Sequence, residues 1–301
     1  MRLRWIFIPL GVLVLGGAIA FYLLAMPGRL AEDWKEKAQP EQQKLRTAMR
    51  DVYRSMSAKT FGADTTLVEK AKGPDQYARA VQKTTARELR QVTPARVAVE
   101  RALRALKEAD EEALTETPDW PALGGRGDLK EVEDIADRER DYIKAARAFL
   151  KRYERLVHYV VDDVRALRRF GITFARGFGA IPDSPTSPGQ VTAPLDATAK
   201  NLNKAVKLLG IKKIPRELRK DHKAHLGFVR FVIAEVRKLS SAVKRRDLAG
   251  IQRFDRNMTR GAKRYPTRVT VRKLVVGSSY ARQIRRLRDT ERTLLRAYER
   301  L

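Results

Sequence analysis

An apolar stripe between Leu129 and Phe170 is the sequence feature that most constrains the fold. Apolar side chains recur there at alternating three- and four-residue spacing, and only Glu139 and Asp163 interrupt the pattern. The other members of the stripe are Val132, Ile135, Tyr142, Ala146, Phe149, Tyr153, Leu156, Val160 and Leu167. This spacing gathers the apolar side chains on one side of an α-helix, as in helical bundles and coiled coils. It predicts a helix over residues 129–170, roughly 60 Å long at about 1.5 Å per residue, and an all-α fold.

The rest of the chain is also patterned for helices. Residues 269–276 are rich in β-branched side chains, but no second strand pattern exists to pair with them, so we assign them to the start of the last helix. Helix starts are marked by capping residues and prolines at Thr93–Pro94, Pro215 and Asp247. Together with the apolar spacing, these signals predict further helices over residues 41–56, 74–91, 94–114, 195–209, 215–243 and 247–265, and a last helix from residue 269 to Leu301. We expect one N-terminal transmembrane helix followed by an elongated bundle of about seven helices.

A glycine- and proline-rich segment occupies residues 171–194. Such a composition interrupts regular structure and is typical of linkers. We therefore predict a helical domain over residues 27–170, a linker over residues 171–194 and a basic helical domain over residues 195–301.

Twenty-two uncharged residues, Trp5 to Met26, precede all of this. As a helix they would span about 33 Å, enough for a hydrocarbon core of about 30 Å. The alternative is a cleaved signal peptide with its small-residue site at residues 18–20. Signal peptides usually have an apolar run of about 7–15 residues, and here the run continues past that site. We expect an uncleaved membrane anchor over residues 1–26, with residues 5–26 in the bilayer.

The orientation of this anchor depends on its flanks. Arg2 and Arg4 form a very short basic tail, which normally stays in the cytoplasm, although the basic residues on the two sides are nearly balanced. We therefore predict a single-pass protein of the cell membrane with residues 27–301 outside the cytoplasm. An anchor of the opposite orientation is the alternative. The chain has no cysteine, which rules out a disulfide framework.

The net charge of +27 is distributed unevenly. Residues 201–301 hold 29 Lys and Arg against 8 Asp and Glu, a net of +21, whereas residues 27–200 are close to balance with 32 against 28. The N-terminal part therefore cannot neutralise the C-terminal third. Such asymmetry indicates a polyanionic partner: anionic lipid headgroups, an acidic wall polymer or nucleic acid.

Two stretches are the candidates for contact with that partner. The last helix carries a row of arginines at four-residue spacing opposite an apolar edge, which is typical of helices that lie on anionic membranes or bind polyphosphate. The candidate residues are Arg285, Arg288, Arg292 and Arg296 in that helix, and Lys212, Lys213, Arg216 and Lys220 in the other stretch. The alternative is an ordinary bundle helix with an arginine-rich outer face. Few aromatic residues are interleaved, which argues against base stacking.

His222 and His225 are the weak candidates for a metal site. Their i, i+3 spacing places two imidazoles on one face of the predicted helix 215–243, within its apolar seam. A metal site needs further ligands, and the only other histidine is His158. Packed structural histidines, or a pH-responsive contact, are the alternatives.

No catalytic motif occurs in the chain, so we expect no enzymatic activity and no cofactor. The leading hypothesis is a non-enzymatic envelope protein whose helical part is an interaction or scaffold module and whose basic third holds an anionic surface. Protein partners could also pack on its helical faces. The alternatives are a metal- or pH-responsive sensor or enzyme centred on His222 and His225, and a cytosolic nucleic-acid-binding domain on an anchor of opposite orientation.

Overall fold

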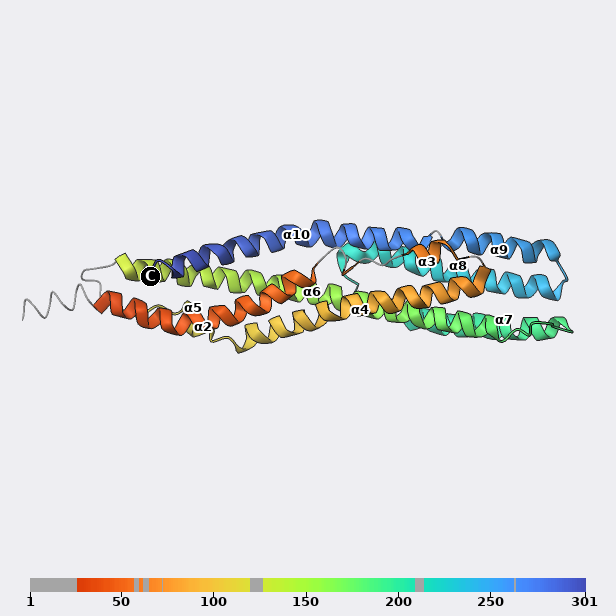
Figure 1. Ribbon diagram of the computed structural model, residues 1–301, viewed down its shortest axis with the longest axis horizontal. Coiled ribbons are helices and arrows are strands. Elements are labelled where there is room, and N and C mark those ends of the chain that lie inside the picture. The colour runs from red at the N-terminus through yellow and green to blue at the C-terminus, as the bar shows by residue number, and fades with distance from the viewer. Residues whose placement is uncertain are drawn as a thin grey trace, which may run out of the picture. The chain divides into compact units, whose positions relative to one another are not determined.

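A computed structural model describes residues 26–56, 60–61, 65–71, 73–119, 127–208, 214–262 and 264–301. Over these residues the chain forms helices and no strand (Figure 1), which confirms the all-α prediction. The helices are α2 (Met26–Ser55), α3 (Thr66–Glu69), α4 (Gly73–Glu108), α5 (Glu111–Thr115), α6 (Gly127–Gly179), α7 (Pro188–Leu208), the 3₁₀ helix η1 (Arg216–Leu218), α8 (Arg219–Lys244), α9 (Leu248–Ala262) and α10 (Arg264–Tyr298).

The predicted membrane anchor, residues 5–26, lies outside the described residues except for Met26, where α2 begins. Among the helices that the structure does describe, none combines the length and apolar character that crossing a membrane requires.

Helix α6 contains the predicted apolar stripe and extends beyond it at both ends, from Gly127 to Gly179. The apolar stripe is buried along its length, as the spacing predicted. The two interruptions, Glu139 and Asp163, are also fully buried. Because burying a charged group is costly without a partner, both positions need compensation from other helices.

The interhelical break is shorter than the segment 171–194 that the sequence predicted as a linker. Helix α6 continues through Gly171 and Gly177, and α7 already begins at Pro188, so only residues 180–187 separate them. The glycines allow close packing: a Cβ on Gly171 would lie 3.2 Å from Val81 Cγ1, and one on Gly177 would overlap Thr198 Oγ1. Glycine is thus used here for helix contact rather than for a flexible connection.

Two prolines lie inside helices that the sequence divides. Pro40 is within α2, and Pro94 is within α4, so the predicted helix start at Thr93–Pro94 is wrong. A proline in a helix costs about 3 kcal/mol, but the neighbours Val92 and Ala95 are fully buried. Their packing holds the helix continuous through the proline. The assignment of residues 269–276 to the last helix is confirmed by α10.

The described chain forms two compact units. Unit 1 contains the residues up to Asp51, Arg101–Lys151 and Gln283–Leu301; unit 2 contains Val52–Glu100 and Arg152–Arg282. The expected domains do not coincide with these units, because α2, α4, α6 and α10 each contribute to both.

In unit 1, Trp34 connects three segments. Its ring stacks on Tyr298 with centroids 5.7 Å apart, and its Nε1 donates a hydrogen bond to the Glu116 carbonyl at 2.8 Å. Leu45, Met49 and Leu294 are buried in the same unit.

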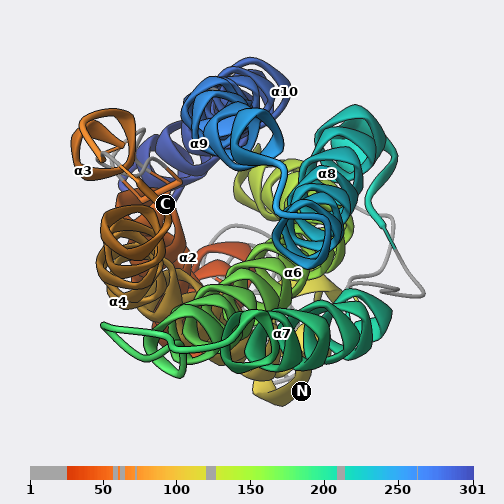
Figure 2. The ribbon, with the colours of Figure 1, turned by 90° about the vertical axis from the view of Figure 1, so that its right-hand side faces the viewer.

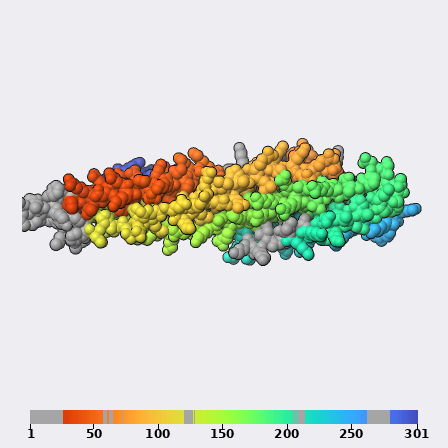
Figure 3. All heavy atoms as spheres, turned by 90° about the horizontal axis from the view of Figure 1, so that it is seen from below, coloured from red at the N-terminus to blue at the C-terminus, as the bar shows by residue number. Residues whose placement is uncertain are grey.

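In unit 2, one core joins apolar side chains of α4, α6, α7, α8 and α9. Figure 2 shows α6 running behind α7 with α8 beside it, and the space-filling view shows α4 and α6 side by side (Figure 3). This core includes Phe170 and Phe174 of α6, Leu195 of α7 and Val232 of α8. The start of α8 is held against α6 by the contacts of His222 with Tyr159 and of His225 with Asp163, which position the basic residues near Arg216.

Candidate anion-binding site

The predicted basic residues fall into two groups. Arg285, Arg288, Arg292 and Arg296 are exposed on α10 and belong to unit 1. Arg216 and Lys220 are exposed in unit 2, at η1 and the start of α8. Lys212 and Lys213 lie outside the described residues.

The apolar edge of α10 is part of the core of unit 1. Leu287, Leu294 and Tyr298 are buried, and Glu291 accepts a hydrogen bond from Arg46 Nε at 3.0 Å. This burial favours the alternative of an ordinary bundle helix with an arginine-rich outer face. The exposed arginine row remains as the outer face of a bundle helix.

The second group belongs to a basic pocket of unit 2. The pocket has a volume of about 760 Å³ and is lined by Arg152, Arg155, Ile214, Pro215, Arg216, Glu217 and Arg219. Four arginines thus face a single carboxylate. Among the residues that the structure describes, no carboxylate forms an ion pair with Arg216 or Arg219, and both side chains are exposed.

Local helical geometry explains why these arginines converge. Arg152 and Arg155 on α6 are three residues apart and share one face of the helix. Arg216 and Arg219 have the same spacing across the junction of η1 and α8. Leu218, between them, is completely buried, so this junction is fixed to the core while the charged side chains remain outside.

Glu217, the acidic residue of the pocket, contacts both Arg152 and Tyr280. Its Oε1 accepts hydrogen bonds from Arg152 Nε and from the Tyr280 hydroxyl, each at 2.9 Å. The Arg152 guanidinium also lies over the Tyr280 ring, 4.9 Å from its centroid, a cation–π arrangement. Burial alone would raise the pKa of Glu217, but hydrogen bonds from its own backbone, Tyr280 and Arg152 lower it. The carboxylate is therefore ionised and holds Arg152 in place.

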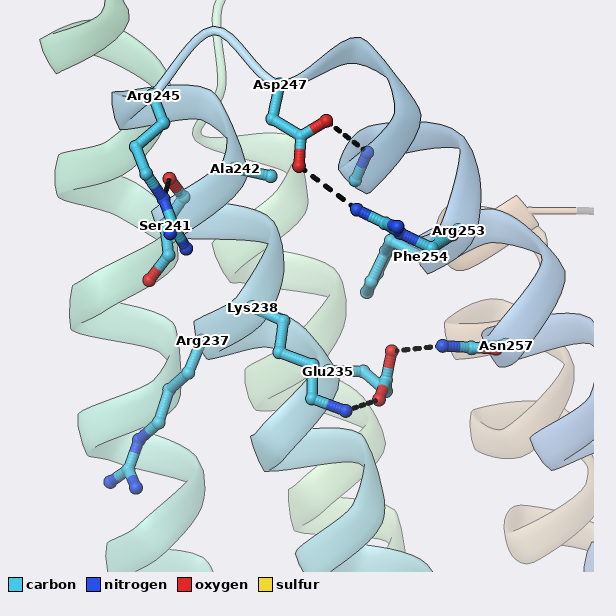
Figure 4. Close-up of a pocket in the computed structure, with 11 residues that line it drawn as sticks. Glu235, Arg237, Lys238, Ser241, Ala242, Arg245, Asp247, Arg253, Phe254 and Asn257 are labelled. Carbon is cyan, nitrogen blue, oxygen red and sulfur yellow. Dashed lines mark hydrogen bonds and ion pairs between the residues drawn. The ribbon is translucent and has the colours of Figure 1, made fainter.

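A second pocket, of about 440 Å³, lies between α8 and α9. Its two acids already have partners (Figure 4): Glu235 accepts from Lys238 and Asn257, and Asp247 accepts from Arg253 and the Gly250 amide. The Asp247 contact with Gly250 confirms the predicted helix cap. Two acidic and four basic residues line this pocket, whereas one acidic and four basic residues line the pocket near Arg216.

His222 and His225 are both buried, and neither lines the two pockets. His222 Nδ1 lies 3.1 Å from the Tyr159 hydroxyl, and His225 Nδ1 lies 2.5 Å from Asp163 Oδ1. Burial lowers the pKa of His222, and the neighbouring charge of His225 lowers it further. No group of three or more His, Cys, Asp or Glu residues in the described part of the chain is placed to hold a metal ion.

Sequence reasoning identified Arg216 but missed Arg152, Arg155, Glu217 and Tyr280. The i, i+3 spacing of the two α6 arginines was visible in the sequence. Their approach to Arg216 was not, because it depends on how α6 and α8 pack. Comparison of the chain with protein-family models, with curated proteins and with solved structures found no match.

Proposed function

We propose that the protein is a membrane-anchored, non-enzymatic helical binding module of the cell envelope that holds an anionic partner. The observation that carries this proposal is the pocket of unit 2, where four arginines face one carboxylate that is already engaged. An anionic partner would supply counter-charges for Arg216 and Arg219, which are exposed and form no ion pair with a carboxylate of the described residues.

The charge distribution of the whole chain supports the same function. The net +21 of residues 201–301 is too large for the nearly balanced remainder to neutralise. Arg285, Arg288, Arg292 and Arg296 add a second exposed basic surface on α10. Basic surfaces of this kind raise the local concentration of polyanions and speed their association.

Residues 5–26 supply the anchor in this proposal, with the amino terminus in the cytoplasm and residues 27–301 outside. The support is the uncharged run itself and the short basic tail before it. A phosphatase reporter fused after Leu301 tests the orientation. Activity outside the cytoplasm is expected, and activity only in the cytoplasm would favour a nucleic-acid-binding role instead.

Vesicle binding by residues 27–301 tests the proposed function. Binding to vesicles containing phosphatidylglycerol should exceed binding to pure phosphatidylcholine by at least about tenfold, because only the former offer negative charge. Replacing Arg288, Arg292 and Arg296 together by Gln should weaken it. Equal binding to both kinds of vesicle would defeat the proposal.

A pH-responsive contact at the histidines is the second candidate function. The observation in its favour is the buried pair of His225 and Asp163, from two different helices. A change in the protonation of this pair would alter the contact that joins α6 to α8. If vesicle binding and helicity are both unchanged between pH 5 and pH 8, this candidate is excluded.

A further inference from the structure

We infer that the line along which α7 and α8 pack is a binding surface for an extended acidic polysaccharide chain. The inference rests on the proposed function, because it names a surface and a chemical class for the anionic partner. This surface, the basic seam, consists of six exposed cations of unit 2: Lys200, Lys204 and Lys207 of α7, and Lys223, Arg230 and Arg237 of α8.

One ion pair shows which faces of α7 and α8 meet at the seam. Lys244 of α8 lies 2.7 Å from Asp196 of α7, and Ser240 donates a hydrogen bond to the same carboxylate at 2.7 Å. The seam cations of α7 follow Asp196 by 4, 8 and 11 residues, and those of α8 precede Lys244 by 7, 14 and 21 residues. Residues at such spacings lie on one side of a helix. The basic seam therefore continues the two faces that the ion pair joins.

The two helices run in opposite directions, which places cations on both sides of the seam. Asp196 lies beside the end of α8, about 38 Å from its start. The seven residues between α7 and η1 span at most about 29 Å, so α7 must run back along α8, as Figure 1 shows. Counted from the ion pair, Lys207 then lies near the level of Arg230. Lys200 in the same way lies near the level of Arg237.

No acid of the two helices balances the seam. Helices α7 and α8 contain three acidic residues, Asp196, Asp221 and Glu235. Asp196 is engaged by Lys244 and Ser240, and the other two acids are buried. None of the six seam cations forms an ion pair with an acid of the described residues. An anionic chain lying along the seam would supply counter-charges without displacing an existing ion pair.

The side chains around the seam disfavour a bilayer and a nucleic acid. Helices that lie on membranes insert large apolar residues, but the exposed large apolar residues of the described chain, Leu67, Val97 and Leu248, lie on neither helix. Proteins that bind single-stranded nucleic acid stack its bases on exposed aromatic rings. Of Phe, Tyr and Trp, the two helices contain only Phe228 and Phe231, and neither is exposed.

A carboxylated sugar chain matches the features that remain. Four of the six seam cations are lysines, which act as flexible point charges and do not need the planar, paired geometry of a guanidinium contact. Asn203, seven residues after Asp196, lies on the same face of α7 and offers an amide that can donate to and accept from hydroxyl groups. Lys223 and Arg237 are about 21 Å apart along α8. The seam is thus long and lined on both sides, as an extended chain requires.

The test is fluorescence anisotropy of a labelled oligogalacturonate long enough to span about 21 Å, titrated with the full chain in neutral detergent. Arg230→Gln with Arg237→Gln should weaken binding about tenfold or more, because two of the six seam charges are removed. The matched control is Arg256→Gln with Arg260→Gln, which removes two exposed arginines of α9 that form no ion pair among the described residues. The control should change the affinity less than about twofold, and circular dichroism should show that both variants remain folded.

A second pair tests the other side of the seam. Lys200→Gln with Lys207→Gln should weaken binding to a similar extent, and an unchanged affinity would overturn the inference. Equal weakening by the α9 control would mean that diffuse charge holds the chain, which would overturn it as well. So would equal affinity for neutral dextran, or tighter binding of oligo(dT) or duplex DNA.

The same measurements separate this inference from the proposed function. Binding of vesicles containing phosphatidylglycerol without binding of oligogalacturonate would overturn the inference and leave the proposed function in place. Binding of neither would defeat both.

Discussion

Asp163 of α6 and His225 of α8 form a fully buried carboxylate–histidine contact in unit 2. Their side chains are 0% and 1% exposed, and the contact is 2.5 Å. A stripe of apolar residues interrupted by one acid was visible in the sequence, but its partner lies 62 residues away. An arginine partner would have been the simplest expectation; helix packing supplies a histidine.

Replacing Asp163 by Asn should therefore lower the free energy of unfolding by about 1–3 kcal/mol, the usual cost of leaving a buried polar group without its hydrogen-bond partner. Asp162→Asn is the matched control, since its side chain is 55% exposed and its contact with Arg165 is 3.7 Å. It should change stability by no more than about 0.5 kcal/mol. Urea denaturation followed by circular dichroism measures both, and similar values would contradict a role for the pair.

Glu139, the other acid in the stripe, belongs to unit 1. Neither of its oxygens has a well-formed hydrogen bond among the described residues. Burial raises the pKa of Glu139 to about 7, the nearby Tyr298 hydroxyl opposes this, and the charge of Glu291 adds to it. The position could be read from the sequence, whereas the partners on α10 could not.

The raised pKa makes the stability of unit 1 dependent on pH. Folded Glu139 keeps a proton that the unfolded chain releases near pH 4.5, so its contribution is complete below that pH and is lost as the pH rises through 7. The loss is on the order of 3 kcal/mol. Glu139→Gln should abolish this part of the decline between pH 5 and pH 8 in urea denaturation. Asp137→Asn, 73% exposed, should leave it unchanged, and an unaltered decline in Glu139→Gln would refute the assignment.

At the level of helices, periodicity predicted the identity of the elements better than their ends. The long helix over residues 129–170 is present within α6 because its stripe is buried on several neighbours. Proline and glycine signals at Pro94, Gly171 and Gly177 were misleading, since tertiary packing there outweighs local propensity. A sequence cannot distinguish a glycine used for a turn from one used for close helix contact.

Gly177 tests this explanation. Gly177→Ala should destabilise the contact of α6 with α7 by about 1–3 kcal/mol, because its Cβ would overlap Thr198 Oγ1. Gly227→Ala, inside α8 with no atom within 4 Å of its Cβ, should instead stabilise the protein by about 0.5–1 kcal/mol. Thermal denaturation of the two variants would contradict the account if both shifted in the same direction.

For the whole molecule, the excess of basic residues in the C-terminal third could be read from the sequence. In the structure these residues are divided between the two compact units. Residues 283–301 belong to unit 1 and residues 201–282 to unit 2, so the basic third is not one compact unit. The arginine row of α10 was visible as a pattern. The pocket was not, because it also requires Arg152 and Arg155 from the middle of the chain.

The salt dependence of vesicle binding tests the central claim, binding of an anionic partner, most directly. Residues 27–301 would be sedimented with vesicles containing phosphatidylglycerol at 50 mM and at 200 mM salt. Contact with about three phosphates predicts that the affinity falls about tenfold or more, because bound counterions are released and exposed charges are screened. An affinity that is the same at both salt concentrations would contradict the account.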